Sequence, residues 1–195
     1  MCAVSDILTC MNSIKVSYLL HVCCAPCASA SLERLLQRGE VVALFYSNSN
    51  IFPYAEYKKR LQEVRRLGKI FAVPVIEDVY DHDAWLAWIH GLEDEPEKGR
   101  RCTKCFSYSL LRTSEKARQL HIPHFSTTLT ISPHKRSPQV FSAAEGLEGF
   151  VPDDFKKKSG FARSIALSNQ YDLYRQNYCG CEFSMKNITA GSNRS

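Results

Sequence analysis

The sequence predicts an α/β protein with one parallel sheet that helices cover on both faces. Short apolar runs of strand length alternate with longer amphipathic segments of helical length. Such an alternation gives right-handed crossovers and hence parallel strands. The chain has 195 residues, of which 45% are hydrophobic, and a net charge of +5. These values fit one domain with a substantial core, exclude a disordered chain, and permit an anionic partner without requiring one.

The first half of the chain contains three expected strands and three expected helices in strict alternation. The strands are predicted over residues 17–22, 41–46 and 73–76. The helices are predicted over residues 27–39, 54–70 and 81–92. Gly39 suits the end of the first helix, and Pro53 precedes the second. A polar turn, residues 47–50, follows the second strand, where the site of such a fold is expected.

The second half continues the pattern less regularly. We expect a helix over 102–120, a strand over 124–129, a helix over 137–150, a loop over 151–160 and a last helix over 163–178. The spacing of Tyr171, Tyr174 and Tyr178 indicates a packed helical stripe, and Trp85 and Trp88 are expected in the core. One catalytic domain is predicted over 17–184, with an N-terminal extension over 1–16 and a disordered tail over 185–195.

Seven of the nine cysteines fall into three short clusters, each at the edge of a predicted element. The clusters are Cys23-Cys24-Ala25-Pro26-Cys27, Cys102-Thr103-Lys104-Cys105 and Cys179-Gly180-Cys181. Cys2 and Cys10 lie outside the predicted elements, and we interpret them as incidental. Residues 1–16 lack the pattern of a signal peptide, and no apolar run is long enough to span a membrane. We therefore expect a cytoplasmic protein, in which clustered cysteines bind metal or perform redox chemistry.

The ligand chemistry leaves two kinds of metal site open. Four thiolates suit either a structural zinc ion or an iron–sulfur cluster. Zinc leaves three cysteines without a role, so the surplus favours redox chemistry, and a disulfide between Cys179 and Cys181 would be strained and easily reduced. Cys23 and Cys24 precede a helix opened by Pro26, whose positive end lowers thiol pKa values. We interpret His21 as a hydrogen-bonded core histidine rather than a ligand.

Six strings in the sequence closely resemble the cobalamin-independent epoxyqueuosine reductases, the QueH family. In chain order they are LLHVCCAPCA (19–28), FYSNSNIFPYAEYKKR (45–60), RCTKC (101–105), STTLTISPHK (126–135), DFKKKSG (154–160) and YRQNYCGCEFS (174–184). The resemblance covers residues 17–184 in the same order. One departure concerns the turn after the second strand, which reads SNSNIFP where a string of the NPNI type is expected.

The resemblance implies the fold, the reaction and the cofactor. The fold would be an adenine-nucleotide α-hydrolase-like, PP-loop-related and Rossmann-like one, with CCAPC in place of the phosphate-binding glycine loop. The reaction would be reduction of epoxyqueuosine to queuosine at the tRNA wobble position. A [4Fe–4S] cluster would be bound by Cys23, Cys24, Cys102 and Cys105, and the pair Cys179 and Cys181 would be a redox-active dithiol. Cys27 would help hold a second metal ion, iron or zinc, or replace one cluster ligand.

Opening the epoxide to an alkene and water requires two electrons and two protons. In our hypothesis the cluster delivers electrons while the cysteine pair cycles between dithiol and disulfide, or a second metal polarises the epoxide oxygen. Asp154, Tyr178 and a cysteine thiol are candidate proton donors. An external electron donor is expected, because the sequence contains no flavin or nicotinamide motif.

Basic residues suggest where tRNA binds. Lys156, Lys157 and Lys158 follow Phe155, which is a candidate for stacking on a base. Arg100 and Arg101 flank the second cluster, whereas the run 58–60 also carries nearby glutamates and is interpreted as a solvated face.

Two alternative functions are weighed against this one. The first is a PP-loop-type tRNA-modifying ATP pyrophosphatase, which an SGGxD-like glycine loop would support; none follows the first strand. The second is a non-catalytic, zinc-stabilised nucleic-acid-binding module, which predicts a colourless protein that contains zinc and no iron.

Overall fold

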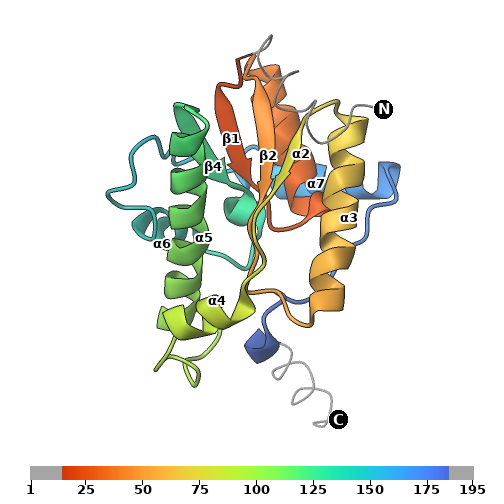
Figure 1. Ribbon diagram of the computed structural model, residues 1–195. Helices are drawn as coiled ribbons and strands as arrows, with labels where there is room; N and C mark the ends of the chain where they lie inside the picture. Colours follow the sequence, from red (N-terminus) through yellow and green to blue (C-terminus); the bar gives the residue numbers. More distant parts are fainter. Residues whose placement is uncertain (1–14, 185–195) are drawn as a thin grey trace.

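The computed structural model describes residues 15–184 and shows a parallel sheet between two layers of helices (Figure 1). The four strands are β1 (Tyr18–His21), β2 (Val42–Tyr46), β3 (Val75–Glu77) and β4 (His124–Thr127), in the order β3-β2-β1-β4. All pairings are parallel, with Tyr18 opposite Val42 on one side and His124 on the other. The predicted fold class is therefore confirmed.

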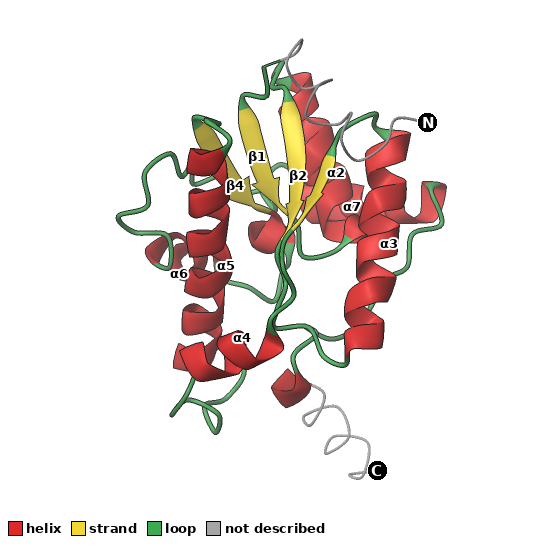
Figure 2. Ribbon diagram, viewed as in Figure 1, coloured by secondary structure: helices red, strands yellow, loops and turns green. Residues whose placement is uncertain are grey.

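The helices divide between the two faces of the sheet (Figure 2). Their bounds are α2 (Ala25–Gln37), α3 (Tyr54–Ile70), α4 (His82–Trp88), α5 (Arg100–Gln119), α6 (Ser137–Ser142) and α7 (Gly160–Gln170), and a 3₁₀ turn, η1, spans Thr128–Ile131. Alternate residues of β1 point to opposite faces. Leu20 packs in the core formed with α2, α3 and α7, and Leu19 packs in the core formed with α5 and α6.

The strand order creates a crevice at the carboxyl ends of β1 and β4. From β1 the chain crosses to β2 on one side of it, whereas β4 is added on its other side. At such a reversal of strand order the connections diverge and leave room for a ligand. Cys23 lies just beyond Val22, the first residue after β1, and its backbone N–H donates to Oγ1 of Thr128, which follows β4, at 3.2 Å. The first cysteine cluster thus lies at the reversal point.

Several helix boundaries differ from the prediction. The helix expected over 137–150 ends at Ser142, and the one expected over 163–178 is α7, which ends at Gln170. Asp172 has a left-handed backbone, with φ of 48°, which ends the helical path. Tyr174 and Tyr178 therefore lie outside a helix, and the predicted tyrosine stripe is wrong. α5 begins at Arg100, so Cys102 and Cys105 lie within its first two turns rather than at its edge.

Other predictions can be checked only within the described residues. Trp85 is buried, as predicted, and Trp88 is partly exposed. Between residues 15 and 184, no helix combines the length and the apolar character that crossing a membrane requires. Cys2, Cys10 and the predicted tail over 185–195 lie outside the described residues.

Candidate metal centre

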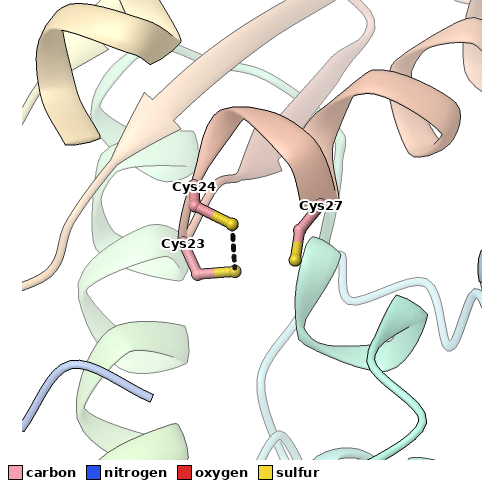
Figure 3. Close-up of side chains that lie close together, drawn as sticks. All are labelled: Cys23, Cys24 and Cys27. Atoms are coloured by element: carbon pink, nitrogen blue, oxygen red, sulfur yellow. Dashed lines mark hydrogen bonds between the residues drawn. The ribbon is translucent and has the colours of Figure 1, made fainter. Parts of the chain in front are cut away.

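The sulfur atoms of Cys23, Cys24 and Cys27 lie together at the start of α2 (Figure 3). All three lie within 4.8 Å of one another, and those of Cys23 and Cys24 are 4.0 Å apart. Cys24 is the N-cap of α2, with extended backbone (φ −169°), and Pro26 lies in the first turn. Cys27 follows three residues later, so the helical turn brings its side chain back beside the N-cap.

The three thiols share protons unequally. Hydrogen bonds from Cys23 and Cys27 hold the pKa of the Cys24 thiol well below its usual value. Sharing with Cys24 raises the pKa of Cys23, and sharing with both neighbours raises the pKa of Cys27. The cluster therefore favours one thiolate, at Cys24, at the positive end of a helix. A metal ion would displace the remaining protons.

Residues from all three cysteine clusters line one cavity of about 470 Å³ in the crevice. The cysteines among them are Cys23, Cys24, Cys27, Cys105 and Cys179.

The two remaining clustered cysteines, Cys102 and Cys181, do not line the cavity, but they contact Lys98 and Cys105, which do. The sulfur of Cys102 accepts the backbone N–H of Lys98 at 3.2 Å, and Cys181 packs against Trp85 and Ile89. Burial raises the pKa of Cys102, of Cys105 and of Cys181, so in the absence of metal these thiols hold their protons.

Lys135 also lines the cavity, and sequence reasoning gave it no role. Burial opposes its charge, but the nearby sulfurs, that of Cys179 foremost, raise its pKa and keep it cationic. Nζ of Lys156 donates to the carbonyl oxygen of Lys135, which ties the predicted basic run to the cavity wall. The available signal was the position of Lys135 in the polar turn beyond the last strand.

Two more polar residues of the cavity were missed, and a third belongs to the predicted turn. The interpretation of the run 58–60 as a solvated face is wrong for Arg60, which is buried on α3 among Tyr57 and Val64. Its Nη2 has no hydrogen-bond partner among residues 15–184. Its place on the apolar face of a helix was the available signal. Gln176 hydrogen-bonds to Cys24 and lowers the pKa of that thiol. Asn48, in the turn after β2, donates to the carbonyl oxygen of Val22 at 2.8 Å and holds that turn beside the cluster.

His21 is the buried, hydrogen-bonded histidine that the sequence predicted. Nδ1 lies 2.8 Å from Oγ1 of Thr127, and Nε2 lies 3.1 Å from the carbonyl oxygen of Ser47. Burial lowers the pKa of His21, so the ring is neutral and links the ends of β1, β2 and β4.

The residues predicted to bind substrate are divided between two places. Tyr178 lines the thiol cavity, whereas Asp154, Lys157 and Lys158 line a second hollow of about 570 Å³ beside α2 and α7. Phe155 is only 1% exposed and packs in the core, so the prediction that its ring stacks on a base is wrong.

The two arginines beside the second cluster also differ from each other. Arg101 is buried and donates to backbone carbonyls of the loop before α5, so it is not available to a phosphate. Arg100 is exposed and pairs with Glu95.

Comparisons with known proteins show the family of this chain. The protein-family model described as "Epoxyqueuosine reductase QueH" matches residues 18–187. The epoxyqueuosine reductase QueH of Streptococcus pyogenes is 38% identical over 186 residues, which cover 90% of this chain and 72% of that protein. The protein of the same name from Thermotoga maritima is 33% identical, over 86% of this chain and 89% of that one.

A solved structure supports the fold alone. The NMN synthetase of Francisella tularensis superposes with a TM-score of 0.52 over 88% of this chain and 70% of the synthetase, at 11% identity. The two chains therefore share one α/β fold, which agrees with the predicted fold class.

Proposed function

Because this chain belongs to the QueH family of epoxyqueuosine reductases, we propose that it reduces epoxyqueuosine to queuosine at the wobble position of tRNA. The observation that carries this proposal is the convergence of cysteines from three distant segments on one cavity at the carboxyl ends of the strands. The reaction removes the epoxide oxygen as water and leaves an alkene, so it consumes two electrons and two protons. A thiol-rich pocket of this size suits such a reduction.

The donor set fits a sulfur-ligated metal group. We assign a [4Fe–4S] cluster to Cys23, Cys24, Cys102 and Cys105, which when bound would transfer electrons one at a time. The mutual approach of the first two sulfurs within 4.8 Å and the cavity position of Cys105 support this set. The same approach of Cys27 supports its role as a ligand, either of a second metal ion or in place of Cys102, which does not line the cavity.

Cys179 and Cys181 are assigned as the two-electron store of this chain. Oxidation of the two thiols to a disulfide releases two electrons and two protons, which balances the conversion of one epoxide to an alkene and water. An external donor then returns the pair to the dithiol. Among the predicted proton donors, Tyr178 lines the cavity and Asp154 does not, which favours Tyr178 over the carboxyl.

We assign tRNA binding to the basic side chains of residues 156–158 rather than to Phe155. Lys157 and Lys158 line the second hollow with Arg34 and Arg38, and Lys156 contacts the cavity wall. Neutralised phosphates release counterions, so tRNA affinity should fall steeply between low and high salt. The variant with Lys157 and Lys158 both changed to Gln should show a shallower salt slope. A slope equal to that of the unchanged protein would exclude this surface.

Anaerobic metal and sulfide analysis combined with a turnover assay tests the function. We expect a brown protein with about four irons or more per chain that converts epoxyqueuosine in tRNA when a low-potential reductant is supplied. A colourless, zinc-containing protein without turnover would favour the nucleic-acid-binding module. Turnover that requires ATP would favour the PP-loop alternative.

A further inference from the structure

Arg60 is a buried cation that α3 presents to the thiol cavity. Its side chain is 1% exposed, and its Nε donates to Oε1 of Glu56, one helical turn earlier, at 2.7 Å. Glu56 also accepts the hydroxyl of Tyr174, which fixes the carboxylate. A guanidinium removed from water must find acceptors for its five N–H groups, because each unmet donor is costly. The partners of Arg60 therefore determine what it does.

Three consecutive residues, 178–180, contact this guanidinium. Nη1 donates to the carbonyl oxygen of Cys179 at 2.9 Å, and the ring of Tyr178 lies 5.1 Å from Cζ. Gly180 approaches so closely that a Cβ atom there would lie 2.9 Å from Nη1 and 3.2 Å from Cζ. Gly180 also has φ of +123°, which other residues rarely adopt. The residue between the two cysteines must therefore be glycine for the segment to lie against Arg60.

No regular secondary structure holds this segment in place. Residues 171–181 form neither helix nor strand. Beyond Arg60, the backbone near the cysteine pair is held by the N–H of Phe52, which donates to the carbonyl oxygen of Gly180 at 2.9 Å, and by the hydroxyl of Ser184, which bonds to Cys181. Glu63 and Arg66 of α3 hold the earlier part of the segment, at Tyr174 and Asp172. Among residues 15–184, the side-chain hydrogen bond from α3 to the cysteine pair comes from Arg60, which lines the same cavity as Cys24 and Cys179.

We propose that Arg60 is a positioning residue that holds Cys179-Gly180-Cys181 at the wall of the thiol cavity. Its flat, forked guanidinium binds Glu56 at one edge and the Cys179 carbonyl at another, and its face accommodates Gly180. Cys179 is thereby kept at the cavity. The consequence for turnover rests on the proposed redox role of the pair, whereas the consequence for the position of the segment does not.

Arg60→Lys removes the planar guanidinium group while keeping the positive charge. A single ammonium group cannot reproduce the planar arrangement that reaches both acceptors. Arg66→Lys is the matched control: Arg66 lies on the same helix, pairs with Glu63 and donates to the carbonyl oxygen of Asp172 at 2.9 Å, but it does not line the cavity. Both variants are examined as full-length protein purified anaerobically with its metal.

Two measurements separate positioning from general stability. In Arg60→Lys, the backbone amides of residues 178–181 should exchange at least five times faster, whereas the exchange rates of the sheet should not change. In turnover, kcat should fall at least tenfold while KM changes less than twofold. Arg66→Lys should leave both the 178–181 amides and kcat within twofold. If Arg60→Lys exchanged the amides of residues 178–181 at the wild-type rate, the proposal would be overturned. This outcome does not depend on whether the wild-type protein is a reductase.

Gly180→Ala provides a second test that leaves Arg60 in place and serves if the lysine variant does not fold. Its new methyl group would occupy the position of the guanidinium face. We expect the same acceleration of exchange and the same loss of kcat. Wild-type exchange and wild-type kcat in Gly180→Ala would show that the glycine–arginine contact does not position the pair.

Discussion

At the scale of single residues, the site depends on where charge is placed among the sulfurs. The thiolate favoured at Cys24 and the ammonium of Lys135 face the same cavity. The potential of an iron–sulfur cluster rises when nearby positive charge offsets the charge of its ligands. Lys135 would thus ease the reduction of a metal group bound by these cysteines.

Lys135→Gln should lower the midpoint potential of the metal-loaded protein. Loss of one nearby charge is worth about one pKa unit for an ionisable neighbour, which for a one-electron couple corresponds to about 60 mV. The measurement is a redox titration followed by visible absorption. Lys69→Gln, at the exposed end of α3, is the control and should leave the potential unchanged. An unchanged potential in Lys135→Gln would show that its charge does not act on the metal group.

Cys181→Ala should abolish turnover while leaving the visible absorption of the metal-loaded protein intact. Cys181 is buried beside Trp85 and is not among the residues that line the cavity, so its loss leaves the cavity cysteines in place and removes only the proposed partner of Cys179. Cys10→Ala, which changes a cysteine outside the three clusters, should retain full turnover. Turnover in Cys181→Ala would refute the dithiol role, and loss of absorption would make Cys181 a metal ligand.

At the scale of elements, α7 depends on a close approach at its first residue. A Cβ atom at Gly160 would lie 1.8 Å from the carbonyl oxygen of Phe155. That oxygen belongs to the backbone of the loop that carries Lys156–Lys158, so the loop would have to move.

Gly160→Ala should therefore lower the free energy of unfolding by about 3 kcal/mol, the upper range for overpacking. Gly146→Ala is the control, because Gly146 has φ of +78° with nothing within 4 Å of a new Cβ atom. Its free energy of unfolding should fall only by the cost of placing alanine in a left-handed backbone conformation, roughly 1 kcal/mol. Urea unfolding of both variants measures the difference. Equal losses of free energy of unfolding in the two variants would show that the loop around Phe155 can move at little cost.

A second element-scale prediction concerns the carboxyl group that joins β3, β2 and α5. Burial opposes ionisation of Asp78, but hydrogen bonds from Arg112 and Ser47 hold its pKa below the ordinary value. Because the folded pKa is the lower one, the stabilisation is present at neutral pH and is lost as pH falls below about 4 through the folded pKa.

Asp78→Asn should lower the free energy of unfolding at pH 7 by about 2 kcal/mol, discounted for the partial exposure of Arg112. At pH 3 and below the difference from the unchanged protein should shrink. Glu33→Gln removes the exposed pair with Arg163 and should cost less than about 1 kcal/mol. Urea unfolding across pH measures both variants. If the difference in free energy of unfolding between Asp78→Asn and the wild type did not change with pH, the ionised Asp78 would not be the source of this stabilisation.

The elements also show what local sequence can predict. The strands and α3 were predictable because their apolar periodicity is continuous, and α3 runs over the predicted residues 54–70. The end of α7 was not, because the left-handed turn at Asp172 involves no glycine or proline. Phe155 was misassigned because a lysine run suggests exposure, whereas its ring packs in the core between α2 and α7.

The same limit applies to the site. The cysteine clusters were predictable because each is compact in sequence, and the strand-end rule predicted the place of the first one. That the other two join it was implied by the resemblance to the QueH family, because neither follows a strand. The apolar face of α3 indicated that Arg60 is buried, but its contact with the cysteine pair was not predictable, because Cys179 and Gly180 are more than a hundred residues away. Contacts between distant segments leave no local pattern.

At the scale of the whole molecule, the three cysteine clusters lie in segments that the hydrogen bonds of the sheet do not join. Cys23 to Cys27 begin α2, Cys102 and Cys105 begin α5, and Cys179 lies in a segment without helix or strand. A metal group that binds only the folded arrangement stabilises it by mass action. The ends of these segments at the cavity should then be the parts most dependent on metal.

Removal of the metal by an anaerobic chelator should therefore loosen three segments together. Hydrogen exchange should accelerate over residues 22–30, 99–106 and 176–184, while β2 and the middle of α3 change little, and the melting temperature should fall. Returning iron and sulfide should reverse both effects, which controls for damage by the chelator. Acceleration confined to residues 22–30 would mean that Cys23, Cys24 and Cys27 hold the metal alone. That result would refute the assignment of Cys102 and Cys105, because ligands that span two segments must respond in both.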